Sequence, residues 1–176
     1  MTETSSTLVT TIHEEPVVSV NSTITGCGDP FHDQRGFMDA MGQSTGSFHA
    51  AQVGLYLKLT AEELCETISA ANPAAASRLK ELFTEVEKLC VVEKDFNEVE
   101  LFDGLQDVLV TTIGAGISAN FPMRQGWDAV LQTNLAKVDP ETGKVRRRAD
   151  GKVLKPEGWV SPTERLTALL AAHRAT

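Results

Sequence analysis

Residues 95–119, DFNEVELFDGLQDVLVTTIGAGISA, indicate the fold class most directly. Apolar side chains recur there at steps of three and four, which is the period of an amphipathic α-helix. The residues on this face are Phe102, Leu105, Leu109, Thr112 and Ile113. Asp95 and Glu98 form a capping box, in which we expect the Asp95 side chain to accept from the Glu98 amide. Gly114 and Gly116 each cost about 1 kcal/mol relative to Ala in a helix, so we expect another helix to approach closely there.

The same helical period appears on both sides of this segment. Helices are predicted over residues 51–71, from an Asn72-Pro73 start to about 93, over 122–136, and from a Ser161 cap to the C-terminal region. A short helix is predicted over residues 37–41. The prediction is an all-α bundle, with a small basic hairpin or loop between Asp139 and Lys155. Residues 1–25 are interpreted as a flexible or extended arm and residues 26–176 as one domain.

Composition excludes several classes of protein. The chain has 176 residues, is 41% hydrophobic and carries a net charge of −8, which fits one acidic globular domain and not a general nucleic-acid binder. No apolar run reaches the roughly 20 residues of a membrane span, and residues 1–25 lack a secretory signal. Three widely spaced cysteines, Cys27, Cys65 and Cys90, favour reduced thiols and a cytoplasmic location.

Charge is distributed unevenly along the chain. Residues 137–155 carry seven Lys and Arg against three Asp and Glu, a net +4, which leaves −12 on the rest. An acidic body with one basic segment suggests a ligand that combines a cation with an anion, such as a metal and a phosphate. The alternative is a solvated hairpin without a ligand.

Acidic side chains form two clusters on predicted helices. Glu63 and Glu66 lie about 60° apart around the helix axis and Glu62 about 40° from Glu66, so the three share a face. Glu100, Asp103 and Asp107 form a second stripe. Clustered carboxylates repel one another unless cations neutralise them, and Mg²⁺ prefers such oxygen ligands together with substrate phosphates. The alternative is that both faces are simply solvated.

The motifs together resemble a known superfamily. Glu63-x-x-Glu66 followed by Glu100-x-x-Asp103 resembles the signature of the all-α nucleoside triphosphate pyrophosphohydrolases, the MazG-like superfamily. Four segments resemble its phosphoribosyl-ATP pyrophosphohydrolase-like branch, common in phages and bacteria: 36–43 (GFMDAMGQ), 103–107 (DGLQD), 133–137 (TNLAK) and 148–155 (RADGKVLK). The likeness covers roughly residues 35–162. It departs at Gly104 and Gln106, where Ala is commoner, and in a somewhat long spacing of 33 residues between the acidic motifs.

The resemblance implies a reaction and a set of roles. A nucleoside triphosphate would be hydrolysed between its α- and β-phosphates, giving a monophosphate and pyrophosphate. Two or three Mg²⁺ or Mn²⁺ ions would be bound by Glu63, Glu66, Glu100 and Asp103. Glu62 is the candidate base that orients the attacking water, with Glu63 beside it in the catalytic set. The substrate would be bound by Asn134, Lys137, Lys152 and Lys155. For Asp107 two roles are considered, an outer acid of the same site and a partner for a basic side chain.

Substrate and assembly follow from the same resemblance, with alternatives. We expect (d)GTP ahead of dUTP or dCTP, and a homodimer or homotetramer with the Leu109–Ile117 face as an interface. The alternatives are phosphoribosyl-ATP hydrolysis and a non-catalytic helical oligomer whose basic hairpin binds a partner. The histidines share no ligand spacing, so loop or surface positions are expected for all four: His13, His32, His49 and His173. Trp159 is a better candidate than Trp127 for stacking on a base.

Overall fold

The computed structural model describes residues 27–148 and 153–175, and its architecture is all-α, as predicted. The α-helices are α1 (Pro30–Ala40), α2 (Ala50–Ala71), α3 (Ala76–Val86), α4 (Glu98–Ser118), α5 (Met123–Leu135) and α6 (Thr163–Arg174). Short 3-10 turns, η1 (Pro73–Ala75) and η2 (Glu87–Leu89), flank α3. The predicted arm over residues 1–25 and the predicted ligand Lys152 lie outside the described residues.

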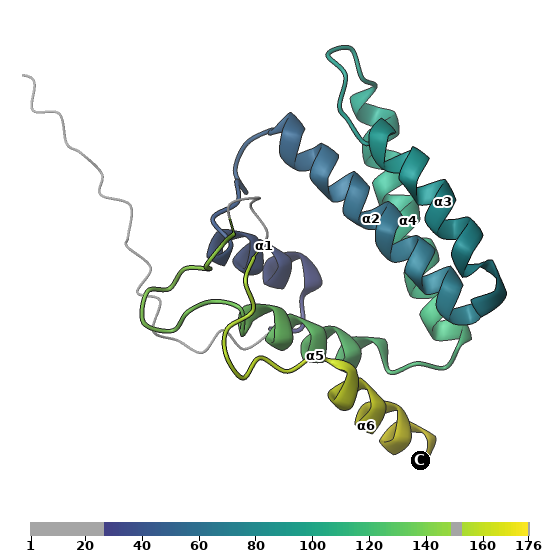
Figure 1. The fold of residues 1–176 in the computed structure, drawn as a ribbon, viewed down its shortest axis with the longest axis vertical. Helices are drawn as coiled ribbons and strands as arrows, with labels where there is room; N and C mark the ends of the chain where they lie inside the picture. Colours follow the sequence, from purple (N-terminus) through teal and green to yellow (C-terminus); the bar gives the residue numbers. More distant parts are fainter. Residues whose placement is uncertain (1–26, 149–152, 176) are drawn as a thin grey trace, which may run out of the picture.

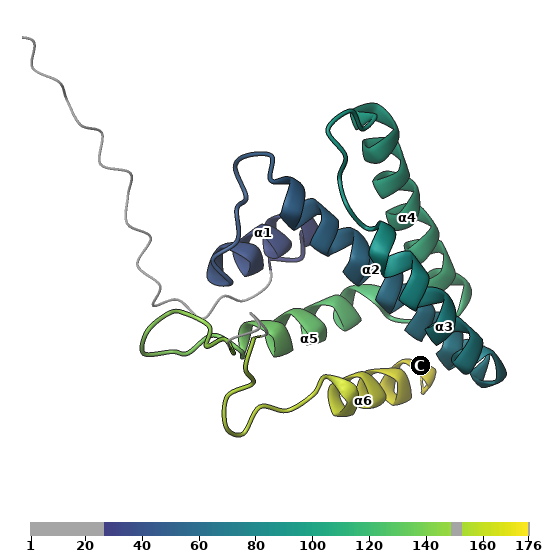
Figure 2. The same ribbon diagram turned by 45° about the horizontal axis from the view of Figure 1, so that its top comes forward.

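The helices form two groups, which Figure 1 shows side by side. In one group α2 and α3 pack as an antiparallel hairpin, with α4 running alongside; in the other, α5 packs against α1 and α6. Figure 2 shows that α4 and α5 diverge from the short loop that joins them. The site residues predicted on α2 and α4 therefore belong to one group and those after α5 to the other.

A glycine allows α4 to meet the start of α5. A Cβ on Gly116 would overlap the Sδ, Cε and Cγ atoms of Met123, the first residue of α5. The predicted close approach is thus confirmed at Gly116. At Gly114 it is wrong for the described chain, because nothing there lies within 4 Å of the position of its Cβ.

Helix starts differ from the sequence prediction at two caps. Asn97, not Asp95, caps α4, and its Oδ1 accepts from the amides of Val99 and Glu100 at 3.2 Å each. Pro162 occupies the cap position of α6 that was predicted for Ser161. The capping residue is set by where the backbone turns from extended to helical, and several neighbouring polar residues satisfy the sequence rule equally well.

Two helices also differ in extent. The segment predicted to run from Asn72 to about 93 begins with η1 and has α-helical geometry only over α3, and the Asn72 side chain makes no capping hydrogen bond. The short helix predicted over 37–41 begins instead at Pro30, capped by Asp29. Asp at the cap and Pro at the first position is a standard start signal, which the glycines on either side had obscured.

The basic segment after α5 forms two isolated antiparallel bridges and no longer strand in its described part. Val138 pairs with Val145, and Arg147 pairs with Val153. The Arg147 guanidinium donates to the Met41 carbonyl at 2.8 Å, which ties this hairpin to the end of α1. The two bridges follow one another along the chain and do not form one ladder, so of the predicted hairpin or loop the described part is a basic loop with two bridges.

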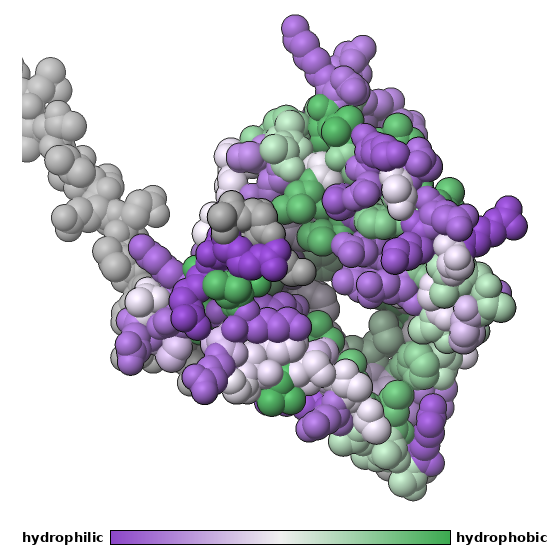
Figure 3. Space-filling view, in the orientation of Figure 1, coloured by the Kyte–Doolittle hydropathy of each residue, from purple (hydrophilic) through white to green (hydrophobic). Residues whose placement is uncertain are grey.

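The hydrophobic core of the described chain is thin. Its buried apolar side chains are Met41 and Leu131, whereas Phe102 on α4 is 65% exposed. The other exposed apolar side chains of α4 include Leu105, Leu109, Ile113 and Ile117. Figure 3 shows apolar residues at the surface and an opening between the two groups of helices. The apolar face predicted for α4 exists, but the described residues leave it largely uncovered.

Candidate functional site

The acidic residues of α2 differ in their exposure. Glu62 is half-buried, whereas Glu63 and Glu66 are exposed. One turn before Glu62, the Lys58 ammonium pairs with Glu87 of η2 at 2.6 Å, and this contact raises the pKa of Lys58. Glu62 adds to that effect through its charge. The helix predicted to carry the E-E-x-x-E cluster is therefore present, with Glu62 near the Lys58–Glu87 ion pair and Glu63 and Glu66 facing solvent.

The acids of α4 are all exposed: Glu100, Asp103 and Asp107. Asp107 lies about 200° around the helix axis from Leu109, so the acidic stripe and the apolar face of α4 point in opposite directions. Within the described residues, none of the four predicted metal ligands on α2 and α4 makes a side-chain hydrogen bond or ion pair. The four carboxylates are thus unpaired, but within the described residues no three of them bring oxygen atoms within 4.8 Å of one another.

The end of α5 and the hairpin bring three predicted substrate ligands together. The Lys137 ammonium donates to Asn134 Oδ1 at 2.7 Å. It also lies 5.7 Å from the centroid of the Trp159 ring, and the Lys155 ammonium lies 4.1 Å from the same centroid. The Trp159 indole is held in turn by donation from Nε1 to the Thr133 carbonyl at 2.9 Å. We call Asn134, Lys137, Lys155 and Trp159 the basic cluster.

The electrostatics of the basic cluster favour an anion. Burial lowers the pKa of Lys137, and the positive charge of Lys155 lowers it further. Among the described residues, no carboxylate lies within ion-pair distance of either ammonium. A bound phosphate would relieve the repulsion between the two lysines, because it places negative charge near both.

The basic cluster and the acids of α4 do not meet within one chain. Asp103 lies about 22 Å from the end of α4, and Asn134 of the basic cluster about 16 Å from the start of α5, at 1.5 Å per residue. The two helices diverge from their junction (Figures 1 and 2). The acids near the start of α4 and the basic cluster at the end of α5 therefore lie apart, towards the far ends of the two helices.

A cavity of about 520 Å³ lies between α1, α4, α5 and the loop after α1. Phe31, Met38, Leu109 and Trp127 give it mostly apolar walls, and Arg35 gives it a positive charge. Leu109 belongs to the face of α4 opposite the acids, so the cavity and the acidic stripe are separate features of the chain.

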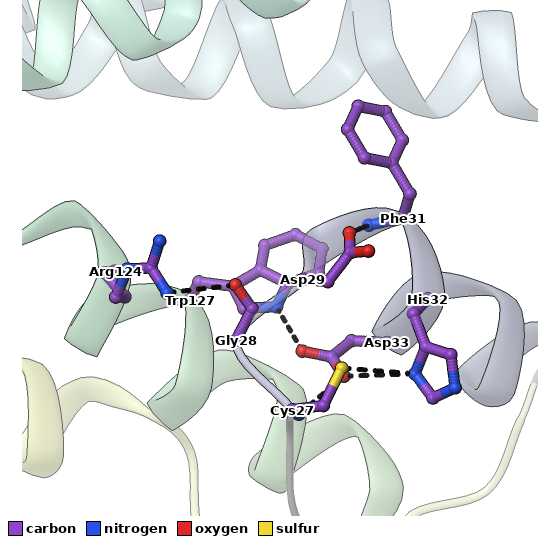
Figure 4. Close-up of polar contacts among 8 residues, drawn as sticks. All are labelled: Cys27, Gly28, Asp29, Phe31, His32, Asp33, Arg124 and Trp127. Atoms are coloured by element: carbon purple, nitrogen blue, oxygen red, sulfur yellow. Dashed lines mark hydrogen bonds and ion pairs between the residues drawn. The ribbon is translucent and has the colours of Figure 1, made fainter.

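A polar cluster that was missed in the sequence lies at the start of α1 (Figure 4). Cys27 Sγ lies 3.3 Å from His32 Nδ1, and the Cys27 amide donates to Asp33 Oδ1 at 2.9 Å. Asp33, whose side chain is only 2% exposed, also accepts from Trp127 Nε1 at 3.3 Å. The hydrogen bond from the Cys27 amide is the largest of the effects that lower the pKa of Asp33. The usable signal was the Asp29-Pro30 helix start, which folds the preceding chain back over the first turn.

Comparison with known proteins supports the fold. No family model and no curated protein matches the sequence significantly. Among solved structures, a crystal structure of a protein from Exiguobacterium sp. 255-15, with the provisional name NTP pyrophosphohydrolase, is similar to this chain with a TM-score of 0.63. The similarity covers 84% of this chain and 96% of that one, at 23% sequence identity.

No helix in the described residues has both the length and the apolar character of a membrane span.

Proposed function

We propose that this protein is a metal-dependent nucleoside triphosphate pyrophosphohydrolase of the MazG-like type. The observation that carries the proposal is the placement of Glu63 and Glu66 on α2, and of Glu100 and Asp103 on α4, as unpaired carboxylates spaced three apart. The fold shared with a protein provisionally named an NTP pyrophosphohydrolase supports the same reaction. Water would attack the α-phosphorus, giving a nucleoside monophosphate and pyrophosphate.

The four carboxylates suit hard divalent cations. They offer only oxygen donors, which Mg²⁺ and Mn²⁺ prefer over nitrogen or sulfur. We assign Glu63, Glu66, Glu100 and Asp103 to hold two or three such ions. Bound there, the ions would neutralise the triphosphate and stabilise the developing charge on the attacking and leaving oxygens.

The other residues have roles that follow from their chemistry. Glu62, half-buried beside the exposed Glu63, is proposed to accept the proton of the attacking water. Lys137 and Lys155 are proposed to bind phosphate oxygens, with Asn134 orienting the Lys137 ammonium through the observed hydrogen bond. Asp107, one turn beyond Asp103, is proposed as an outer acid on the same stripe.

A second copy of the chain would cover the apolar face of α4. Within one chain the basic cluster lies apart from the acids of α4, and the apolar face of α4 is uncovered. Monomeric proteins rarely leave large contiguous apolar patches exposed. We therefore propose a homodimer or homotetramer in which this face is buried against a second copy. Sedimentation equilibrium tests this, with Phe102→Glu expected to shift the assembly towards monomer; a monomeric parent at micromolar concentration would contradict the proposal.

Product analysis tests the reaction. Each NTP and dNTP is incubated with the protein in Mg²⁺, in Mn²⁺ and in EDTA, and monophosphate and pyrophosphate are quantified. We expect both products, loss of activity in EDTA, and the fastest turnover with (d)GTP, the preference implied by the family resemblance. Turnover of phosphoribosyl-ATP alone would identify the related reaction of the same family.

A matched pair of variants tests the site. Glu63→Gln should reduce kcat at least about 100-fold, since it removes a proposed metal ligand. Glu81→Gln on α3, another exposed glutamate outside both acidic clusters, should leave kcat unchanged. If Glu63→Gln is as active as Glu81→Gln, the assignment of Glu63 on α2 as a metal ligand is wrong.

A further inference from the structure

We propose that Cys27, His32 and Asp33 bind a divalent transition metal, with Zn²⁺ the ion that fits best, at a site separate from the carboxylates of α2 and α4. One donor atom from each residue lies within 4.8 Å of the other two. Figure 4 shows the three side chains converging where the chain enters α1. The proposal does not depend on the proposed enzymatic activity.

The spacing of the donor atoms matches tetrahedral zinc. With Zn–S near 2.3 Å and Zn–N or Zn–O near 2.0 Å, neighbouring ligand atoms lie about 3.3–3.6 Å apart. Cys27 Sγ and His32 Nδ1 are 3.3 Å apart, and His32 Nδ1 and Asp33 Oδ1 are 3.7 Å apart. Small side-chain rotations would therefore place all three atoms around one ion.

The types of donor select the metal. A thiolate and an imidazole bind Zn²⁺ and its transition-metal neighbours and are poor ligands for Mg²⁺. The thiolate and the carboxylate together balance a charge of +2. Both anions lie at the N-terminal end of α1, where the helix dipole stabilises negative charge.

The surroundings of Asp33 hold its carboxylate in place. Asp33 Oδ1 accepts from the Cys27 amide, and Oδ2 accepts from the Trp127 indole of α5. A carboxylate oxygen has two lone pairs, so Oδ1 can accept this hydrogen bond and still bind a metal. Outer hydrogen bonds of this kind orient the ligands of metal sites.

One position of the site is open to solvent. Cys27 is exposed and the His32 side chain is 74% exposed, whereas Asp33 is buried beneath them. An ion can reach the three donors from solution, and water would occupy its fourth position. The bound ion would fasten the chain at Cys27 to α1 and, through Asp33 and Trp127, to α5.

The test uses untagged, full-length Cys65→Ser/Cys90→Ser protein, in which Cys27 is the remaining thiol, in excess Mg²⁺. Titration with Zn²⁺ is followed by calorimetry, and titration with Co²⁺ by absorption. We expect one tightly bound ion per chain and a thiolate-to-cobalt charge-transfer band. Adding Cys27→Ser should abolish the band and weaken Zn²⁺ binding by about 100-fold or more.

His32→Gln, with His173→Gln as its matched control on α6, tests the second ligand. His32→Gln should weaken Zn²⁺ binding similarly, and His173→Gln should not change it. Cys27 and His32 are exposed, so the circular dichroism spectra of both metal-free variants should match the spectrum of the parent. If Cys27→Ser does not fold, the Zn²⁺ affinity of His32→Gln tests the proposal in its place. Glu63→Gln should leave the cobalt band unchanged, which separates this site from the proposed active site. Absence of Zn²⁺ binding in the Cys65→Ser/Cys90→Ser protein, or unchanged binding after Cys27→Ser, would overturn the proposal.

Discussion

Gly54→Ala should destabilise the protein and disturb the position of the acidic helix α2. A Cβ at Gly54 would lie 2.8 Å from the Cys90 carbonyl oxygen and 3.6 Å from Val91 Cα. The clash at 2.8 Å is with backbone, which cannot rotate away as a side chain can, so α2 and the 90–91 segment must separate by about 0.6 Å to restore ordinary contact.

The net effect is the difference of two contributions. Overpacking of this kind costs about 3 kcal/mol, the upper end of the usual range, because both sides of the contact belong to the main chain. The higher helix propensity of Ala offsets about 1 kcal/mol. We therefore expect a net loss of about 2 kcal/mol in the free energy of unfolding.

Gly104→Ala on α4 is the matched control. It is also a helical glycine, but nothing lies within 4 Å of its Cβ position. It should gain about 1 kcal/mol, so the two variants should differ by about 3 kcal/mol, or roughly 6–12 °C in Tm for a chain of this size. Thermal unfolding by circular dichroism at one fixed protein concentration measures this. A Tm for Gly54→Ala equal to or above that of the parent would refute the reasoning.

Three further predictions follow from single contacts. Asn97→Ala should lower the free energy of unfolding by about 1 kcal/mol, because it removes the cap of α4, whereas Asp95→Ala should lower it little. If urea denaturation shows the larger loss for Asp95→Ala, Asp95 and not Asn97 is the cap. Asp33 has a lowered pKa in the folded protein, so its contribution to stability is present above its unfolded pKa of about 4 and is lost as pH falls through the folded pKa. The Asp33→Asn variant should therefore have a lower Tm than the parent at pH 7, and its Tm should change less as the pH is lowered. A pH dependence of Tm equal to that of the parent would contradict this. Lys155→Met should raise the pKa of Lys137 only part of the way to its ordinary value in an NMR titration, because burial is the larger cause of the shift; full recovery would mean that charge repulsion dominates.

Sequence periodicity located the long helices well but not their starts. The α2, α4 and α5 segments were predicted within a few residues, because the 3.6-residue repeat extends over several turns of each. The starts of α4 and α6 were misplaced, because a cap depends on the backbone angles of one residue and neighbouring polar residues compete for that role. The extent of α1 was missed because Gly36 within it and the glycines on either side of it were interpreted as loop.

The basic cluster illustrates how far local motifs reach. Asn134 and Lys137 were both predicted as substrate ligands from the resemblance of the 133–137 segment, and a hydrogen bond joins them in the structure. That Lys155 and Lys137 share the Trp159 ring depends on the path of the hairpin, which brings together residues 18 or more positions apart. The Cys27–His32–Asp33 cluster escaped notice because its spacing of five and one matches no standard ligand motif, and Asp33 is buried only once α5 places Trp127 beside it.

The all-α class, the acidic stripes and the charge asymmetry of this chain follow from residue order alone, since each depends on neighbours within a few turns. The tertiary structure decided which faces meet. Among the described residues, it separated the acids of α4 from the basic cluster and left the apolar face of that helix uncovered. These outcomes depend on the angles between helices, which are set by contacts between distant residues such as Gly116 with Met123 and Gly54 with Cys90, and such contacts leave no periodic signal in the sequence.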